Sequence, residues 1–140
     1  MPERLREVMT PDPVTVAATA SLQHAAELMR DRNIGDVLVV DESGALYGIV
    51  TDRDIVVAGI AEGVDPASTS VDEVCTQDPV SLGPDDAVAQ AAKLMSDRAI
   101  RRLPVVDNGT VVGIVSLGDL AIDRDPSSVL GEISEAPPNN

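Results

Sequence analysis

The sequence has 140 residues but no tryptophan, no phenylalanine and a single tyrosine, Tyr47. Proteins that bind single-stranded nucleic acid stack bases on aromatic side chains, so this composition argues against that class. Positive charge is also scarce, because 10 lysines and arginines stand against 24 acidic residues and give a net charge of −14. Binding to duplex DNA or RNA needs clustered positive charge, so no nucleic-acid partner is expected. The excess of acid is expected to keep the protein soluble.

Cysteine and histidine each occur only once. Cys75 has no partner for an internal disulfide, and we interpret it as a small apolar residue in a reducing compartment. His24 lies among the polar positions of a predicted helix, where we expect it to be exposed. No Ser-His-Asp, Cys-His, P-loop or dinucleotide-binding pattern occurs in the sequence. The sequence therefore predicts that the protein is not an enzyme.

Long apolar runs are absent as well, and none approaches the roughly 20 residues that span a membrane. The N-terminal Met-Pro-Glu-Arg does not resemble a signal peptide, so we expect a cytoplasmic protein without membrane contact. Acidic residues two positions apart occur at Asp52 and Asp54 and again at Asp123 and Asp125. No third ligand accompanies either pair, so no metal site is predicted.

The sequence does contain an internal repeat. The segment that begins at Ser21 recurs from Ala87, 66 residues later, with the Ala-Ala, Leu-Met and Asp-Arg pairs in the same places. A single unit of about 60 residues buries too little surface to be more than marginally stable. We therefore expect two like halves that complete each other, with any ligand sites in pairs.

In the first copy the apolar pattern predicts a short strand over 14–16, a helix capped by Ser21, strands over 37–40 and 45–50, and a second helix from Asp52. The buried face of the first helix is expected to comprise Leu22, Ala25, Ala26 and Met29.

The second copy repeats this pattern, with strands over 103–106 and 111–115 and an Asn-Gly turn between them. The predicted fold class is therefore α+β, built from two tandem β-α-β-β-α repeats. The expected boundaries are 1–66 for the first repeat with its leader, 67–123 for the second repeat, and 124–140 for a short C-terminal helix (127–133) and a disordered tail.

One spacing points to ligand chemistry. Thr51 ends a predicted strand and Asp54 lies one turn into the next helix, and Ser116 and Asp119 repeat this arrangement. A carboxylate can accept hydrogen bonds from the vicinal hydroxyls of a ribose, while the hydroxyl and the free N–H groups at the helix start can hold phosphate. The alternative is that these residues only cap their helices. A duplicated cap would recur too, so the repeat leaves both interpretations open.

The motifs together resemble a pair of CBS domains, the tandem called a Bateman module, from about Val8 to Leu120. The resemblance rests on Met-Thr-Pro-Asp-Pro-Val-Thr-Val at 9–16, Ala-Ala-Glu-Leu-Met at 25–29, Arg-Leu-Pro-Val-Val-Asp at 102–107 and Gly-Ile-Val-Ser-x-x-Asp at 113–119. It implies two repeats packed sheet to sheet with pseudo-two-fold symmetry. It also implies two clefts that bind AMP, ADP, ATP or S-adenosylmethionine as a regulatory ligand, with no obligatory cofactor.

Carried over by position, the resemblance implies that Asp54 and Asp119 face a ribose, with Thr51 and Ser116 near ribose or phosphate. The residues implied to line the adenine slots are Thr15, Gly35, Asp36 and Leu38 in the first cleft, and Ser81, Arg101, Arg102 and Pro104 in the second.

The two clefts are not equivalent in charge. The second has Arg101 and Arg102 where the first has Gly35 and Asp36. Arginine offsets phosphate charge, so we expect the second cleft to prefer an anionic nucleotide. The alternative is that the arginines form ordinary surface ion pairs.

Two functions remain open at this point. The first is a regulatory sensor whose halves change their arrangement when an adenosyl ligand binds, because the ligand prefers one arrangement. The second is a ligand-free structural or protein-interaction module with degenerate clefts. Either would act in trans on an unknown protein partner. The resemblance also implies a homodimer, for which the apolar helix over 55–61 offers a surface.

Overall fold

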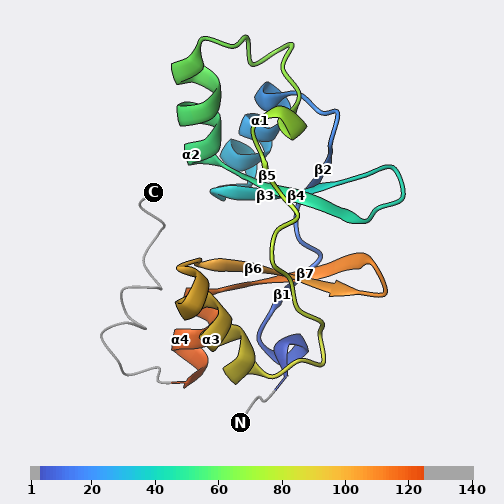
Figure 1. The fold of residues 1–140 in the computed structure, drawn as a ribbon, viewed down its shortest axis with the longest axis vertical. Coiled ribbons are helices and arrows are strands. Elements are labelled where there is room, and N and C mark those ends of the chain that lie inside the picture. The colour runs from blue at the N-terminus through green and yellow to red at the C-terminus, as the bar shows by residue number, and fades with distance from the viewer. Residues whose placement is uncertain (1–3, 125–140) are drawn as a thin grey trace. The chain divides into compact units, whose positions relative to one another are not determined.

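The computed structural model describes residues 4–124, and the side chains of 4–120. This part of the chain is a mixed α+β protein with two sheets (Figure 1), which confirms the predicted fold class. Contacts divide it into two compact units, one formed by residues 14–79 and the other by 4–13 together with 80–124. The predicted boundaries at 66 and 123 concern where each sequence repeat ends, which the division into spatial units does not test, so they stay a prediction. The predicted helix over 127–133 and the tail lie outside the described residues.

The 14–79 unit contains a four-stranded sheet in the order β2-β3-β4-β5. Strand β3 (Asp36–Val40) pairs in parallel with β2 (Thr15–Ala17) and antiparallel with β4 (Leu46–Thr51). Strand β5 (Thr76–Gln77) pairs antiparallel with β4 at the edge. Side chains alternate between the faces of a strand, so the apolar run of β3 supplies both faces of a buried central strand.

Two helices cover one face of this sheet (Figure 1). Helix α1 (Leu22–Arg32) begins at Ser21, whose hydroxyl accepts a hydrogen bond from the His24 N–H at 3.0 Å, as its predicted role as a cap requires. The second helix consists of α2 (Asp52–Asp54), a π-helical turn and a 3-10 turn that ends at Glu62. We call this continuous segment the 52–62 helix.

The prediction for Ala26 was wrong. Ala26 is exposed, whereas Leu22, Ala25 and Met29 are buried. The buried positions follow the spacing i, i+3, i+7, so the helix touches the sheet along a narrower stripe than the sequence pattern suggested.

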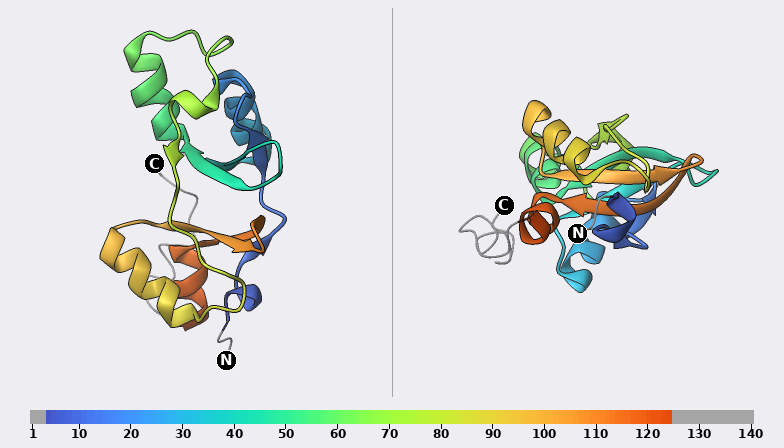
Figure 2. Two further views of the ribbon diagram at one scale, coloured as in Figure 1. Left: turned by 45° about the vertical axis from the view of Figure 1, so that its right-hand side comes forward. Right: turned by 90° about the horizontal axis from the view of Figure 1, so that it is seen from below.

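The other unit has a three-stranded sheet in the order β1-β7-β6. Strand β7 (Thr110–Ser116) pairs antiparallel with both β1 (Thr10–Pro11) and β6 (Arg102–Asp107). Helices α3 (Val88–Arg98) and α4 (Leu117–Arg124) lie on one face of it (Figure 2). A single parallel bridge between Leu82 and Val105 takes the place that β2 has in the first unit.

The segments that precede the two repeats are exchanged between the units. We call residues 4–13 strap 1 and residues 70–79 strap 2. Strap 1 inserts Leu5, which has no exposed surface, into the core of α3, β6 and β7, and strap 2 inserts the equally buried Val71 into the core of α1, β3 and β4. Strap 1 ends in β1 and strap 2 in β5, so each unit is completed by the leader of the other repeat.

A glycine lies where each strap passes the sheet. A Cβ atom on Gly113 would lie 2.5 Å from Met9 Sδ and 3.0 Å from the Thr10 carbonyl oxygen. A Cβ atom on Gly48 would lie 2.5 Å from the Thr76 carbonyl oxygen and 2.8 Å from Cys75 Sγ. At Gly48 the backbone of strap 2 occupies the space that a side chain would need. At Gly113 the space is taken by the Met9 side chain of strap 1, with the Thr10 carbonyl oxygen in tight contact.

An exposed ionic contact also holds strap 1. Asp85 Oδ1 lies 2.6 Å from Arg6 Nη2 and 3.3 Å from Arg4 Nη1. The hydrogen bond from Arg6, followed by the positive charges of both arginines, lowers the pKa of the Asp85 carboxyl below its usual value. Because the pKa is lower in the folded state, this contribution is present above the unfolded-state pKa and is lost as the pH falls through the folded-state pKa.

Asp85→Asn is therefore expected to reduce the loss of stability on acidification. Urea unfolding measured at about pH 6 and about pH 3 checks this, since the contribution of the ionic contact to stability begins to fall below the unfolded-state pKa in the wild type and is absent in the variant. Asp97→Asn, at the exposed pair with Lys93 on α3, is the matched control. An unchanged difference between the two pH values in Asp85→Asn would show that the contact contributes nothing.

Candidate functional site

Each unit contains a reciprocal pair of hydrogen bonds between a hydroxyl residue and a carboxylate, which we call a box. In the first box the Asp54 N–H donates to Thr51 Oγ1 at 3.0 Å, and the Thr51 N–H donates to Asp54 Oδ2 at 2.9 Å. In the second, the Asp119 N–H donates to Ser116 Oγ at 3.0 Å, and the Ser116 N–H donates to Asp119 Oδ2 at 2.9 Å. The capping role considered from the sequence is thus present in both units.

Capping uses only one of the two oxygens of each carboxylate. Each box engages Oδ2, and among the described residues no donor reaches Oδ1 of Asp54 or Asp119. Both side chains are half-buried. A carboxylate that is fixed through one oxygen and open at the other can accept hydrogen bonds from a ligand without rearranging, so capping and ligand binding are compatible.

The sheet register brings several predicted residues of the first unit to the first box. Asp36 lies directly opposite Thr51, and the Gly35 carbonyl accepts the Asp52 N–H at 3.0 Å. Leu38 is the partner of Thr15 on β2. Thr15 is exposed, whereas Leu38 is 1% exposed and therefore fully buried in this conformation.

The second unit repeats this arrangement around the second box. Arg102 lies opposite Ser116, and the Arg101 carbonyl accepts the Leu117 N–H at 2.9 Å. Pro104 is fully buried, and its carbonyl accepts the Leu82 N–H at 3.2 Å. Ser81 is exposed and immediately precedes Leu82.

The two arginines predicted for the second site, Arg101 and Arg102, lie in different surroundings. Arg102 on β6 is the cross-strand partner of Ser116 on β7. Arg101 lines a hollow of about 380 Å³ at the C-terminal end of α3. The other residues that line it are Ala92, Met95, Ser96, Ala99, Ile100 and Leu117. The structure therefore brings Arg102, but not Arg101, to the position opposite the box.

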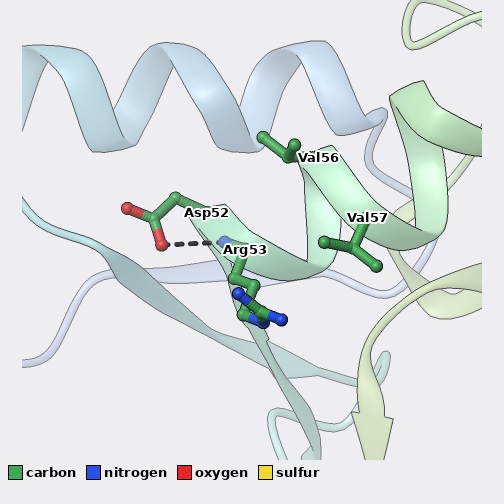
Figure 3. A pocket seen from close by; sticks show the side chains of 4 residues that line it. All are labelled: Asp52, Arg53, Val56 and Val57. Carbon is green, nitrogen blue, oxygen red and sulfur yellow. Dashed lines mark hydrogen bonds between the residues drawn. The ribbon is translucent and has the colours of Figure 1, made fainter.

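A second hollow, of about 230 Å³, lies on the 52–62 helix and was not predicted (Figure 3). It is lined by Asp52, Arg53, Val56 and Val57. Asp52 Oδ1 accepts the Arg53 N–H at 2.8 Å. The sequence signal for this surface was the apolar stretch that begins at Ile55, which contains more apolar residues than the buried side of the helix uses: Ile55 is buried, whereas Val56, Val57 and Ile60 are exposed.

The thiol of Cys75 lies close to the first box. Burial raises its pKa most, and the carboxylates of Asp72 and Asp54 raise it further. The thiol is thereby held in its protonated form, which is the less nucleophilic one. Its place against Gly48 agrees with the interpretation of Cys75 as a packing residue.

Residues 4–124 contain neither a cluster of metal ligands nor a membrane-spanning helix. No three histidine, cysteine, aspartate or glutamate side chains in this range are grouped as metal ligands would be. No helix in the same range is long and apolar enough to cross a membrane.

The arrangement of both units matches known proteins. A family model described as the CBS domain matches residues 5–60 and again residues 71–122. The chain belongs to the CBS domain family. The CBS pair recognised from the sequence motifs is thereby confirmed. The CBS domain-containing protein YhcV of Bacillus subtilis is 42% identical to it over 120 residues, which are 86% of this chain and 84% of that protein.

Two solved CBS structures were determined with ligands. The CBS domain pair of protein MJ0100, in complex with 5′-methylthioadenosine and S-adenosyl-L-methionine, is 30% identical with a TM-score of 0.77, over 89% of this chain and 98% of that one. CBSX2, in complex with AMP, is 25% identical with a TM-score of 0.76, over 88% and 96% of the two chains.

Proposed function

We propose that this CBS protein is a regulatory module that binds an adenosyl ligand: AMP, ADP, ATP or S-adenosylmethionine. The observation that carries the proposal is the pair of boxes, each with a fixed carboxylate open at Oδ1. The AMP and S-adenosylmethionine complexes of the related CBS proteins support it. In this proposal Asp54 and Asp119 accept the ribose hydroxyls. Thr51 and Ser116 contribute near ribose or phosphate, together with the helix N–H groups.

The remaining predicted residues would surround the base and the phosphate. Thr15, Gly35, Asp36 and Leu38 belong to the first site, and Ser81, Arg101, Arg102 and Pro104 to the second. Since Leu38 and Pro104 are fully buried in this conformation, they contribute to the base slot only after a local rearrangement.

We also propose that the two sites differ in ligand charge. Arg102 lies opposite the second box and Asp36 lies opposite the first. A phosphate is attracted to the guanidinium and repelled by the carboxylate, so the second site favours an anionic nucleotide. The sulfonium of S-adenosylmethionine is positive, so the first site tolerates it better than it tolerates a phosphate.

Asp119→Asn is expected to weaken AMP binding at least tenfold, whereas Asp54→Asn leaves it within about twofold. Asparagine keeps an oxygen that can accept the capping N–H but lacks the charge that strengthens hydrogen bonds to a ribose. Titration calorimetry measures binding, and thermal shift reports it independently, since a ligand at 100 times its Kd adds about 2.7 kcal/mol.

Asp97→Asn, which changes an exposed acid on α3, is the control for net charge. If only Asp54→Asn abolished AMP binding, the assignment of the two sites would be reversed. If none of the four adenosyl ligands shifted the melting temperature of the wild type, the ligand-free interaction module would be the better account. The buried Leu38 and Pro104 and the fully formed caps are the observations that favour this second function.

We further propose that the protein forms a homodimer through the 52–62 helix. Val56, Val57 and Ile60 are 57%, 48% and 52% exposed, and they are the large apolar side chains that stand out at the surface of the described part. Apolar side chains grouped in this way mark an interaction surface. In a two-fold symmetric contact the same patch serves both copies, so an apolar patch that matches itself favours a second copy as the occupant.

A protein partner that reads the ligand state, a cytoplasmic location and the absence of enzymatic activity complete the proposal. The scarcity of histidine and cysteine supports the last of these, because little is left for acid-base or nucleophilic chemistry at neutral pH. The net charge of −14 supports a module without a nucleic-acid partner.

A further inference from the structure

Through the two straps, each repeat builds part of the other unit. Strap 1 is fixed by backbone hydrogen bonds from the Leu5 N–H to the Asp86 carbonyl (3.0 Å) and from the Arg6 N–H to the Pro84 carbonyl (2.9 Å). Strap 2 is fixed in the same manner, by the bond from the Val71 N–H to the Ala20 carbonyl (2.7 Å). Because each strap combines a buried apolar side chain with main-chain pairing, it is an integral part of its unit.

The connection from each strap to the repeat that follows it is short and stiff. Only residues 12–14 separate β1 from β2, and three residues span at most about 10 Å. Asp12 has φ 51° and Asp78 has φ 50°, in the left-handed region that non-glycine residues rarely adopt. A proline with restricted φ follows each of them. Such a junction has little freedom to absorb a displacement of the strap.

On the far side of each junction the chain enters the other unit at a strand next to a candidate site residue. Strap 1 leads to β2, which begins at Thr15. Strap 2 leads through Ser81 to Leu82, whose N–H donates to the Pro104 carbonyl and whose carbonyl accepts the Val106 N–H at 2.8 Å. The positions of β2 and of the Leu82 bridge therefore depend on a strap held by the opposite unit.

We infer that the two straps couple the repeats mechanically, so that loosening a strap in one unit also loosens the first strand of the repeat that follows it. The coupling runs in both directions, from β4–β5 to Leu82 and from β7–β1 to β2. It is a property of the fold and needs no ligand, so it holds or fails independently of the proposed function. It predicts that a change at one sheet edge is felt in the other unit before either unit unfolds.

Hydrogen exchange of the full chain with Gly48→Ala tests the inference. The added Cβ collides with the backbone oxygen of Thr76, so β5 must move away from β4. Exchange at the amides of Leu82 and Val106, in the other unit, is expected to accelerate on the order of tenfold. The control is Val37→Ala, which opens a cavity in the same core but creates no collision at the β4–β5 pairing, and which is expected to leave these two amides unchanged relative to the rest of their unit.

The reciprocal variant is Gly113→Ala, read at the amides of Leu38 and Ala18, which bond to the Val14 and Val40 carbonyls at 3.1 and 3.0 Å. Its effect is expected to be smaller, because the nearest obstacle is the flexible end of Met9 rather than backbone.

Should Gly48→Ala fail to fold, the double change Thr76→Gly and Gln77→Gly loosens β5 by lowering its strand propensity, without a steric collision. Faster exchange at the Asp78 amide together with faster exchange at Leu82 and Val106 supports the coupling. Faster exchange at Asp78 with unchanged rates at Leu82 and Val106 overturns it, because the Asp-Pro junction would then have absorbed the movement.

Discussion

Leu5→Ala is expected to lower the free energy of unfolding by about 2–5 kcal/mol, although Leu5 lies in a short leader outside the repeat that it precedes. Its side chain has no exposed surface and packs with Met95, Leu103 and Leu120 in the core of the other repeat. Truncation removes these contacts and leaves a cavity. A domain of this size has a total stability of about 5–15 kcal/mol, so a large share would be lost. Urea unfolding followed by circular dichroism measures the change.

Thr10→Ala is the matched control, because Thr10 belongs to the same strap but is exposed. Its effect is expected to stay within about 0.5 kcal/mol. If Leu5→Ala also stayed within that limit, strap 1 would be resting on the second repeat without contributing to its core.

Val57→Asp is expected to convert the proposed dimer to monomer, with dimer affinity falling at least about 100-fold. Val57 is half-exposed in the monomer, so the substitution costs the isolated fold little. In a two-fold symmetric contact each change is present twice, and two unpaired carboxylates would be removed from water at the same interface. Sedimentation equilibrium or light scattering over a concentration series measures the effect.

Gln90→Glu, at an exposed position of α3 in the other unit, is the matched control, since it adds one negative charge away from the 52–62 helix. Its dimer affinity is expected to stay within about twofold of the wild type. A dimer that survives Val57→Asp would contradict this interface.

The repeat, the element order and the hydroxyl–carboxylate spacing could all be predicted because they are written in local patterns. Helix caps at Ser21 and Thr51 depend on residues three positions apart, and strand alternation on residues two apart. The exchange of straps could not be predicted in this way. Leu5 and Val71 are isolated apolar residues in short turns, and nothing in their neighbourhood specifies which core accepts them. The single available signal was that a lone repeat is too small to be stable.

In the candidate site, too, local patterns predicted some features and could not predict others. The sequence identified both boxes, but it could not choose between capping and ligand binding, and the structure shows why: one carboxylate oxygen is used and the other is open. From the sequence, Arg101 and Arg102 were both predicted to line the second cleft. They are adjacent in the chain, yet Arg102 lies opposite Ser116 while Arg101 lines the hollow beside α3.

The exchanged straps give the two-repeat chain the topology of a dimer of single repeats. In a domain-swapped dimer, each copy lends an identical segment to its neighbour. Here strap 1 completes the second repeat and strap 2 completes the first, so the duplicated chain reproduces that topology within one molecule. One repeat with its own leader, expressed alone, is therefore expected to assemble as a swapped pair rather than to persist as a folded monomer.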